Sequence, residues 1–401
     1  MINEETQAFI RDHCHDDVRK LALKRAPERV DLRQALQQIE GWQMAEKKLP
    51  SWTEKDGLWF PPRLSMEQCS SEQTARYKRE LVARLLCLDE GDFAGMMVDF
   101  TGGFGIDFSF LAVLFRRAVY MERQSELCRI ARHNFKILGL DMAEVCEGDS
   151  SECPQEWHEA ALYYIDPARR DVVGRKTVAI EDCTPDLTLL QDDMLGKAQF
   201  CLVKLSPMLD IHAALRSLKH VCEVHVVCVQ GECKELLLVM SAHQAADSVA
   251  YHCVDIGPEG KVKSLVFTEK EERDASCNHV SEVGCYLYEP NAAILKCGGY
   301  RVLAARYGLC KLHPNSHLYT SDVLCKDFPG RVFNVEQVSG FGKHELGEML
   351  KNIPKANLAV RNFPETVVVL RKRLRLKEGG DIYLFATTLN DGRHVMIRCR
   401  K

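Results

Sequence analysis

The stretch from Val98 to Asp107, VDFTGGFGID, decides the fold. It ends an apolar run at Asp99, contains three glycines and leads into the helical pattern IDFSFLAVLFRR. Glycine suits a backbone that bends tightly and approaches a ligand, because no Cβ stands in the way. The stretch therefore predicts a strand, a glycine loop and a helix. Its spacing differs from GxGxxG, and no Lys or Ser/Thr follows the glycines as in a phosphate loop, so a polyphosphate ligand is disfavoured.

Short apolar strands and amphipathic helices alternate after this stretch. The second strand is AVYMER, and the helix SELCRIARHNFKILG follows it. Five further strand-like runs read AEVCEGD, ALYYIDP, AQFCLVKLSP, VCEVHVVCV and ELLLVMS. Apolar runs without polar alternation are typical of parallel strands that are covered by helices on both faces. We predict an α/β fold with a doubly wound, Rossmann-like domain over residues 65–242.

Acidic residues follow four successive strands: Asp99, Glu122, Asp149 and Asp166. Doubly wound sheets bind ligands at the carboxyl ends of their strands, and an acid about twenty residues after the glycine loop binds the two ribose hydroxyls of a nucleotide. Asp149 and Ser150 stand where the edge of an adenine would be hydrogen-bonded. A single acid at a strand end is usually a cap or a solvated loop residue. Four of them in register predict a cofactor that contains a nucleoside.

The remaining residues predict three further regions. Residues 1–64 place apolar side chains at three- and four-residue spacings, which is typical of helices. Their connector carries Trp52, Trp59 and Phe60, which either cover the cofactor, stack on bases or are simply buried. One long helix is expected from Ser65 to Leu88. Residues 243–330 and 331–401 predict two small α+β modules, and the charged stretch EKEERDASCNH in the first is expected to be mobile.

Charge is distributed unevenly along the 401 residues. The chain is 46% hydrophobic and 27% charged, which excludes wholesale disorder, and its net charge of −4 is too balanced to mark the whole protein as a nucleic-acid binder. Residues 331–401 hold 14 Lys/Arg and 7 Asp/Glu, a net +7 that leaves −11 for the first 330 residues. One helix there carries basic residues opposite an apolar face, and this basic face is either solvated or binds phosphates. Its members are Arg371, Lys372, Arg373, Arg375 and Lys377.

The 18 cysteines are spread singly, and neither a CxxC motif nor the Cys/His spacing of a zinc site occurs. Most of them are expected to be reduced thiols that pack as small hydrophobes. The sequence contains no signal-peptide core and no run of 18 apolar residues. We therefore expect a cytoplasmic protein with no metal and no membrane partner.

The pattern of glycines and acids resembles that of class I S-adenosylmethionine-dependent methyltransferases: D-x-T-G-G-x-G, then Glu, Asp and Asp-Pro after the next strands. The resemblance implies that Asp99 and the backbone around Thr101, Gly102, Gly103 and Gly105 hold the methionine part. It further implies that Glu122 binds the ribose, and that Asp149 binds the adenine with Ser150 beside it.

More narrowly, nearly the whole chain resembles bacterial methyltransferases with a C-terminal THUMP-like domain. The matching stretches are LSMEQCSSEQTARYK, VDFTGGFGIDFSFL, YIDPARRD, VKLSPMLDI and RNFPETVVVLRKRLRLKEGGDIYLFATT. The ferredoxin-like module would occupy residues 243–330 and the THUMP-like module residues 331–401. Because THUMP domains in related enzymes contact RNA, the resemblance implies tRNA or rRNA as substrate.

Asp166-Pro167-Ala168-Arg169 stands where amino-group methyltransferases carry Asn/Asp-Pro-Pro-aromatic. In those enzymes the acid and the next carbonyl accept hydrogen bonds from an exocyclic amine, and the aromatic ring stacks on the extruded base. Here Ala and Arg replace the last two positions. Arg169 either stacks on a base, binds a phosphate or is a surface residue.

Uracil C5 methylation requires a cysteine nucleophile just past the fifth strand. That place is taken here by Leu205 or Ser206, and Cys201 falls inside the strand. Nitrogen methylation, which needs in-line positioning and removal of a proton, is therefore the better prediction. Lys204 closes the same strand and either serves the catalytic site or forms an edge ion pair.

These observations predict an RNA methyltransferase that acts at a base nitrogen, with Asp166, Pro167, Arg169 and Lys204 as its catalytic residues. Two alternatives stay open. One is methylation of a protein or small molecule, and the other is a non-catalytic RNA-binding protein that retains the cofactor fold.

Overall fold

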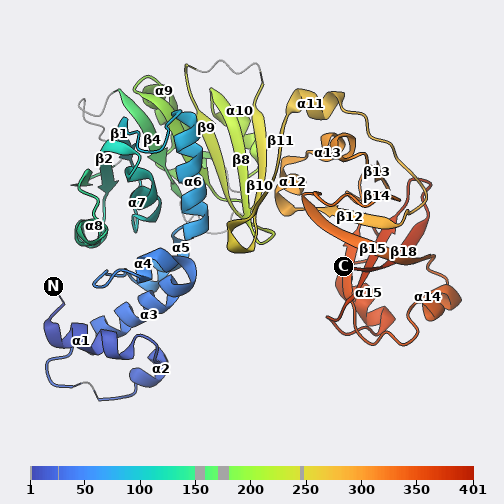
Figure 1. The fold of residues 1–401 in the computed structure, drawn as a ribbon, viewed down its shortest axis with the longest axis horizontal. Helices are drawn as coiled ribbons and strands as arrows, with labels where there is room; N and C mark the ends of the chain where they lie inside the picture. The colour runs from blue at the N-terminus through green and yellow to red at the C-terminus, as the bar shows by residue number, and fades with distance from the viewer. Residues whose placement is uncertain (1, 26, 150–158, 170–179, 244–247) are drawn as a thin grey trace. The chain divides into compact units, whose positions relative to one another are not determined.

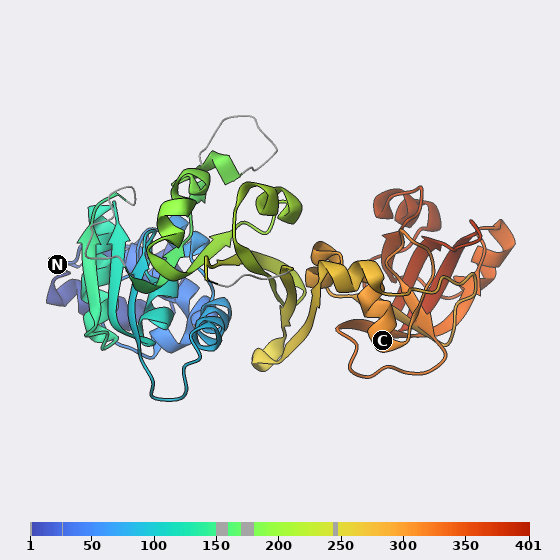
Figure 2. The same cartoon turned by 90° about the horizontal axis from the view of Figure 1, so that it is seen from above.

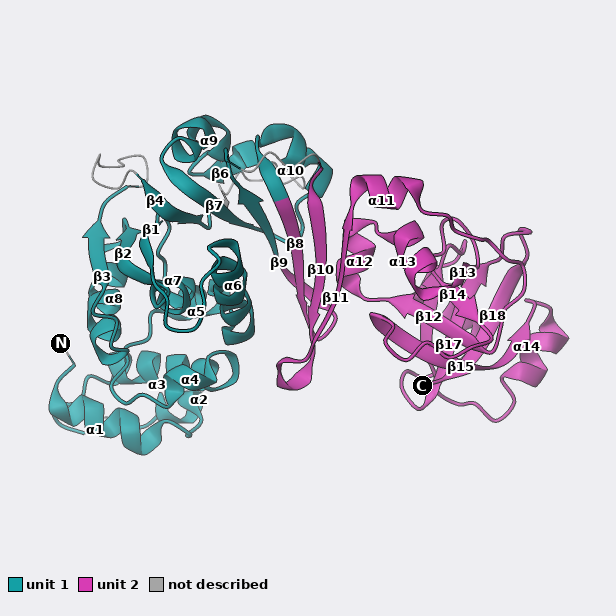
Figure 3. Ribbon diagram, turned by 45° about the horizontal axis from the view of Figure 1, so that its top comes forward, with its two compact units in different colours: residues 1–222, 236–245 teal, residues 223–235, 246–401 magenta. Residues whose placement is uncertain are grey.

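The computed structural model describes residues 2–25, 27–149, 159–169, 180–243 and 248–401. The chain forms two compact units (Figure 3), one of residues 1–222 with 236–245 and the other of residues 223–235 with 246–401. Within the described ranges, no helix is long and apolar enough to cross a membrane. None of the cysteines in these ranges is part of a disulfide.

The first unit begins with short helices, as predicted (Figure 1). They are α1 (Glu4–His13), α2 (Val18–Leu21), α3 (Leu32–Lys48), α4 (Pro50–Thr53) and α5 (Arg63–Gln68). The connector aromatics Trp52 and Phe60 are buried in one core with Phe104 and Ile106 of the glycine-loop region. The rings of Trp52 and Phe104 lie edge to face, 5.2 Å apart. The interpretation of these connector residues as core residues is therefore confirmed.

The helical stretch expected from Ser65 to Leu88 is largely helical but is divided into two helices, because residues 69–71 between α5 and α6 (Glu72–Leu85) are not helical. Ser71 begins α6 as its N-cap, and its Oγ accepts a hydrogen bond from the backbone N–H of Thr74 at 3.3 Å. Serine competes for backbone hydrogen bonds inside a helix and is favoured at such caps. The break also turns the side chain of Ser70 inward, where it is buried.

The sheet of the first unit has the strand order β3-β2-β1-β4-β7-β9 (Figure 3). Figure 2 views the fold from above. The first five strands in this order are parallel, and β9 pairs antiparallel with β7. This is the predicted α/β arrangement, although the helix after the glycine loop ends at Ala112, earlier than its apolar pattern suggested. The strands are β1 (Ala94–Asp99), β2 (Phe115–Glu122), β3 (Ala143–Glu147), β4 (Ala160–Ile165), β7 (Ala198–Leu205) and β9 (Glu232–Met240). The helices along this part of the chain are α7 (Ile106–Ala112), α8 (Ser125–Ile137), α9 (Leu187–Leu195) and α10 (Ile211–Ser217).

In the second unit, β8 (Val221–Val229) pairs in parallel with β10 (Ala250–Ile256). β10 pairs antiparallel with β11 (Val262–Thr268). The next segment, expected to be mobile, begins instead with the helix α11 (Glu269–Asp274). Thr268 and Glu271 form a capping box at its start, in which each side chain bonds the backbone N–H of the other residue. These two hydrogen bonds stabilise the start of the helix although the segment contains many charged residues.

The C-terminal strands form one seven-stranded sheet in the order β13-β14-β12-β15-β18-β17-β16. The pairing of β12 with β15 joins residues 286–290 to residues 330–334. After β12 come two helices, separated at Gly298–Gly299. The strands are β12 (Tyr286–Pro290), β13 (Cys310–Lys311), β14 (Tyr319–Ser321), β15 (Gly330–Ser339), β16 (Asn357–Arg361), β17 (Ile382–Thr388) and β18 (His394–Arg400). The helices are α12 (Ala292–Cys297), α13 (Tyr300–Tyr307), α14 (Lys343–Met349) and α15 (Val367–Leu374).

Candidate active site

The glycine loop joins β1 to α7 and is shaped by its own packing. A Cβ on Gly102 would lie 2.2 Å from Cε2 of Tyr120, so only glycine fits against this buried ring. Gly103 and Gly105 have φ angles of 55° and 82°, in the left-handed region that favours glycine. The three glycines therefore bring the backbone of the loop close to β2, which carries Glu122 at its end.

Glu122 accepts hydrogen bonds from the backbone N–H groups of Gly103, at 2.9 Å, and Gln124, at 2.8 Å. Glu122 thus holds the glycine loop, which contains the predicted cofactor residues Thr101, Gly102, Gly103 and Gly105. A carboxylate offers about four acceptor sites, so these two bonds leave capacity for ribose hydroxyls. Asp149 is exposed and directly follows Gly148 at the end of β3. Ser150 lies outside the described residues.

Asp99 is buried at the end of β1, and its Oδ1 accepts a hydrogen bond from the backbone N–H of Thr101 at 2.9 Å. Burial raises the pKa of Asp99 well above its usual range, and the nearby negative charges of Asp107 and Asp166 add to the effect. The hydroxyl of Thr101 in turn accepts a hydrogen bond from the backbone N–H of Asp166 at 2.6 Å. Thr101 therefore ties the glycine loop to the end of β4.

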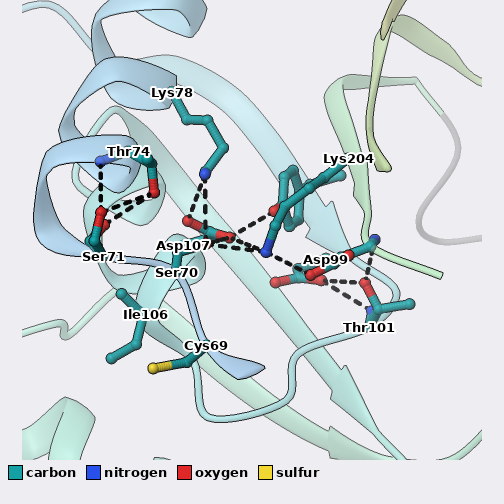
Figure 4. Close-up of polar contacts among 12 residues, drawn as sticks. Cys69, Ser70, Ser71, Thr74, Lys78, Asp99, Thr101, Ile106, Asp107 and Lys204 are labelled. Atoms are coloured by element: carbon teal, nitrogen blue, oxygen red, sulfur yellow. Dashed lines mark hydrogen bonds and ion pairs between the residues drawn. The ribbon is translucent and has the colours of Figure 1, made fainter. Parts of the chain in front are cut away.

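Lys204, at the end of β7, connects the predicted catalytic residue Asp166 to a buried ion-pair network. Figure 4 shows the part of this network formed by Lys78, Asp107 and Lys204. Nζ of Lys204 lies 2.6 Å from Oδ2 of Asp166 and 3.3 Å from Oδ2 of Asp107. The same ammonium donates to Oγ of Ser70 at 3.0 Å. The Lys204 side chain is 12% exposed and that of Asp166 is 38% exposed, so the network reaches the surface at Asp166.

Asp107, in the first turn of α7, is the centre of this network. Lys78, which is fully buried on α6, places its Nζ 3.1 Å from Oδ1 of Asp107. The hydroxyls of Ser70 and Tyr164 each donate to Oδ2 at 2.7 Å. Burial favours the neutral carboxyl, but Lys78 and Lys204 outweigh it and lower the pKa of Asp107 below its usual range. Two lysines, Lys78 and Lys204, thus face the two carboxylates of Asp107 and Asp166, so the opposite charges of the network are balanced.

Sequence reasoning missed Ser70, Lys78 and Asp107. Lys78 did leave a signal, because it falls on the buried face of α6 with Thr74, Leu81 and Val82. A lysine on an apolar face needs a partner. Asp107 left none, since an acid in the first turn of a helix is common for reasons of helix polarity alone.

The other predicted catalytic residues lie next to Asp166. Pro167 is buried, and Ala168–Arg169 form the short strand β5. This strand pairs antiparallel with β6 (Cys183–Thr184), with Arg169 opposite Cys183. Cys201 is buried within β7, and burial raises the pKa of its thiol to about 12. A neutral, enclosed thiol of this kind is a poor nucleophile.

The predicted RNA-binding residues lie on and after α15 in the second unit. Three of them line a surface hollow of about 580 Å³. The hollow is lined by Leu358, Val367, Val368, Arg371, Lys372, Arg375, Leu376 and Glu378. Arg373 is directed elsewhere, to an ion pair with Glu365. Lys377 is exposed and donates its backbone N–H to the carbonyl of Pro354.

Comparisons with known proteins agree with this architecture. A family model for a ferredoxin-like domain matches residues 286–329, and a model for a THUMP domain-like family matches residues 330–401. A solved structure from Porphyromonas gingivalis W83, named as a methyltransferase, is 36% identical with a TM-score of 0.87. The match covers 99% of this chain and 97% of that one.

Two curated relatives come from Mycobacterium tuberculosis strains CDC 1551 and H37Rv, and both are named as uncharacterised S-adenosylmethionine-dependent methyltransferases. Each is 27% identical over 339 residues, which is 83% of this chain and 86% of the relative. With its doubly wound sheet and its two C-terminal domains, the chain belongs to the family of S-adenosylmethionine-dependent methyltransferases that carry ferredoxin-like and THUMP-like domains.

Proposed function

We propose that this S-adenosylmethionine-dependent methyltransferase acts on RNA, either tRNA or rRNA, at a base nitrogen. The observation that carries the proposal is the half-exposed Asp166 carboxylate, which Lys204 holds beside the glycine loop. An acid followed by proline at the end of the fourth parallel strand suits recognition of an exocyclic amine.

The carboxylates at the strand ends fit the cofactor. Asp99, Glu122 and Asp149 present carboxylates at three neighbouring strand ends, which match the ammonium, hydroxyl and amine donors of S-adenosylmethionine. A cofactor ammonium next to Asp99 would favour the charged form of this buried carboxyl, whose raised pKa reflects burial without a cation. When bound, S-adenosylmethionine supplies an electrophilic methyl group.

Asp166 would act by accepting hydrogen bonds rather than by taking the proton. Lys204 bonds Oδ2 and stabilises the ionised carboxylate. We assign Oδ1 and the carbonyl of Pro167 as acceptors for the two amine hydrogens. These acceptors orient the nitrogen lone pair and stabilise the positive charge that develops on the amine during methylation. The proton then leaves to water.

RNA as the substrate class is supported by the second unit. Residues 330–401 match the THUMP domain-like family, and residues 331–401 carry a net +7. The hollow on α15 combines Arg371, Lys372 and Arg375 with exposed Val368, an apolar surface bordered by cations. Cations beside an apolar surface suit a phosphate backbone and the face of a base.

The test is methyl transfer from radiolabelled S-adenosylmethionine to tRNA and rRNA fractions from cells that lack the gene, followed by mass spectrometry of the nucleosides. We expect an N-methylated nucleoside, and we expect Asp166→Ala to lower the rate at least about 100-fold with cofactor affinity unchanged. Asp141→Ala, an exposed acid after α8, is the matched control.

Three results would contradict the proposal. Radiolabel in protein or small-molecule fractions would show that the substrate is a protein or a small molecule and not RNA. A C-methylated nucleoside would exclude nitrogen chemistry. Cofactor binding without transfer to any fraction would favour the non-catalytic interpretation.

A further inference from the structure

Two histidines and a glutamate converge on one face of the paired strands β8 and β10. Glu223 and His225 are two positions apart on β8, so their side chains emerge on the same face. His252 on β10 is the direct parallel partner of His225 in the sheet register. The two imidazole rings are stacked, with centroids 4.1 Å apart and planes 15° from parallel.

The polar atoms of the three residues point at a common place. Nε2 of His225 lies 2.8 Å, and Nε2 of His252 lies 3.7 Å, from the same Oε2 of Glu223. One ligand atom from each residue falls within 4.8 Å of the other two. No other group of three His, Cys, Asp or Glu residues in the described ranges converges this closely.

These separations are close to those of a tetrahedral zinc site. Zinc bonds to imidazole nitrogen and carboxylate oxygen at about 2.0–2.2 Å, which places neighbouring ligand atoms roughly 3.3–3.5 Å apart in a tetrahedron. The two measured nitrogen-to-oxygen distances lie on either side of this range. Binding of zinc would therefore lengthen the shorter of these two distances and shorten the longer one.

The burial of this cluster and the chemistry of its ligand atoms indicate which class of ion it would bind. The His225 side chain is 1% exposed, while Glu223 and His252 are 14% and 18% exposed, so the cluster is enclosed but has a path to solvent. Two imidazoles and one carboxylate suit zinc and its neighbours in the first transition row, whereas magnesium and calcium prefer oxygen ligands. Three protein ligands leave a fourth position for water.

We propose that Glu223, His225 and His252 bind one Zn²⁺ ion that links β8 to β10. All three ligands belong to the second unit, and none was assigned to the methyl-transfer site. The expectation of no metal rested on Cys/His spacing along the chain. This ligand set has no such spacing, because the parallel pairing of two strands brings His252 to His225.

The test uses the full chain without a polyhistidine tag, freed of metal by chelation and then dialysed against Zn²⁺. We expect one equivalent of bound zinc by elemental analysis and a melting temperature at least about 3 °C higher than in chelator. Substitution with Co²⁺ should give the visible absorption of a four-coordinate site.

His252→Gln and Glu223→Gln, the two more exposed ligands, should each abolish the bound equivalent and the thermal shift. His344→Gln on α14 is the control, because His344 is exposed and lies outside the cluster. In unmodified protein, Zn²⁺ should also protect His252 from acylation by diethyl pyrocarbonate, a readout that does not depend on a variant folding. Absence of a zinc equivalent, or an equivalent that survives both substitutions, would show that the cluster is a hydrogen-bonded group only.

Discussion

Nζ of Lys204 lies 2.6 Å from Oδ2 of Asp166, and this ion pair stands where the buried charge network of the first unit reaches the surface. Lys204 also contacts Asp107, whose other oxygen contacts Lys78. The carboxylate that we propose to receive the substrate is therefore held by a chain of ion pairs from three different elements, β7, α7 and α6. Its orientation depends on the whole network rather than on the Asp-Pro motif alone.

Replacing Lys204 by Met should impair methyl transfer more than cofactor binding. The change removes the cation that orients Asp166 and leaves Asp107 with a single lysine. We expect the single-turnover rate to fall about 100-fold, while the dissociation constant of S-adenosylhomocysteine changes less than about threefold. Lys219→Met, which removes an exposed ion pair with Asp192, is the control. An unchanged rate would remove Lys204 from the proposed mechanism.

Lys78→Met should destabilise the first unit by about 3–5 kcal/mol, because it breaks a buried ion pair and leaves Lys204 as the one lysine for both Asp107 and Asp166. The double variant Lys78→Met/Asp107→Leu restores charge balance, since Lys204 and Asp166 still pair. It should therefore be more stable than the single variant. Denaturant unfolding of the three proteins measures both differences. A double variant that is less stable than Lys78→Met would show that hydrogen bonds to Ser70 and Tyr164 outweigh the charge.

Asp99→Asn should stabilise the protein without cofactor at neutral pH, by about 1–2 kcal/mol. The folded-state pKa of Asp99 is raised, so its contribution to stability is greatest below the unfolded pKa and is lost as pH rises through the folded value. An asparagine side chain does not titrate, so the variant lacks this pH dependence. The difference in unfolding free energy between variant and wild type should therefore shrink as pH falls toward 4. The same variant should weaken cofactor binding, and titration calorimetry at pH 7.5 would show whether it does.

The contribution of Asp107 to stability depends on pH in the opposite direction to that of Asp99. Its lowered pKa makes a contribution to stability that is present above the unfolded pKa and is lost as pH falls through the folded value. Acid unfolding of wild type should therefore be steeper below about pH 4 than that of Asp107→Asn. Parallel curves for the two proteins would contradict the assignment of a charged Asp107.

Gly102→Ala should destabilise the protein by about 1–3 kcal/mol, since the new methyl group would lie 2.2 Å from the Tyr120 ring. Gly95→Ala is the matched control within β1, because its Cβ would meet nothing within 4 Å. Thermal unfolding distinguishes the two. Equal melting temperatures would mean that Tyr120 moves aside at little cost.

The double charge reversal Lys372→Glu/Arg375→Glu should weaken RNA binding uniformly across sequences and reduce the slope of affinity against salt concentration. Both side chains line the hollow on α15. Lys343→Glu/Lys351→Glu, on and just after α14 in the same sheet domain, controls for net charge. Fluorescence anisotropy at several salt concentrations provides the measurement. Equal losses in the two variants would indicate a general charge effect rather than a site.

Several features followed from local sequence because their causes are local. The apolar runs, the glycines after Asp99 and the acids at strand ends predict a parallel α/β sheet, since each depends on residues within a few positions. Helix ends were less predictable. The break before α6 depends on Ser71 as a cap and on Ser70 turning toward Asp107, and only the second of these is a tertiary contact.

The sequence by itself determined which strands form, which carboxylates end them and which segment carries excess positive charge. The tertiary structure alone decided the partners of those carboxylates. Lys78, Asp107 and Lys204 come from α6, α7 and β7, and no spacing along the chain relates them. The physical reason is that a buried charge is stable only when an opposite charge packs against it, and that partner is chosen by the three-dimensional packing of separate elements.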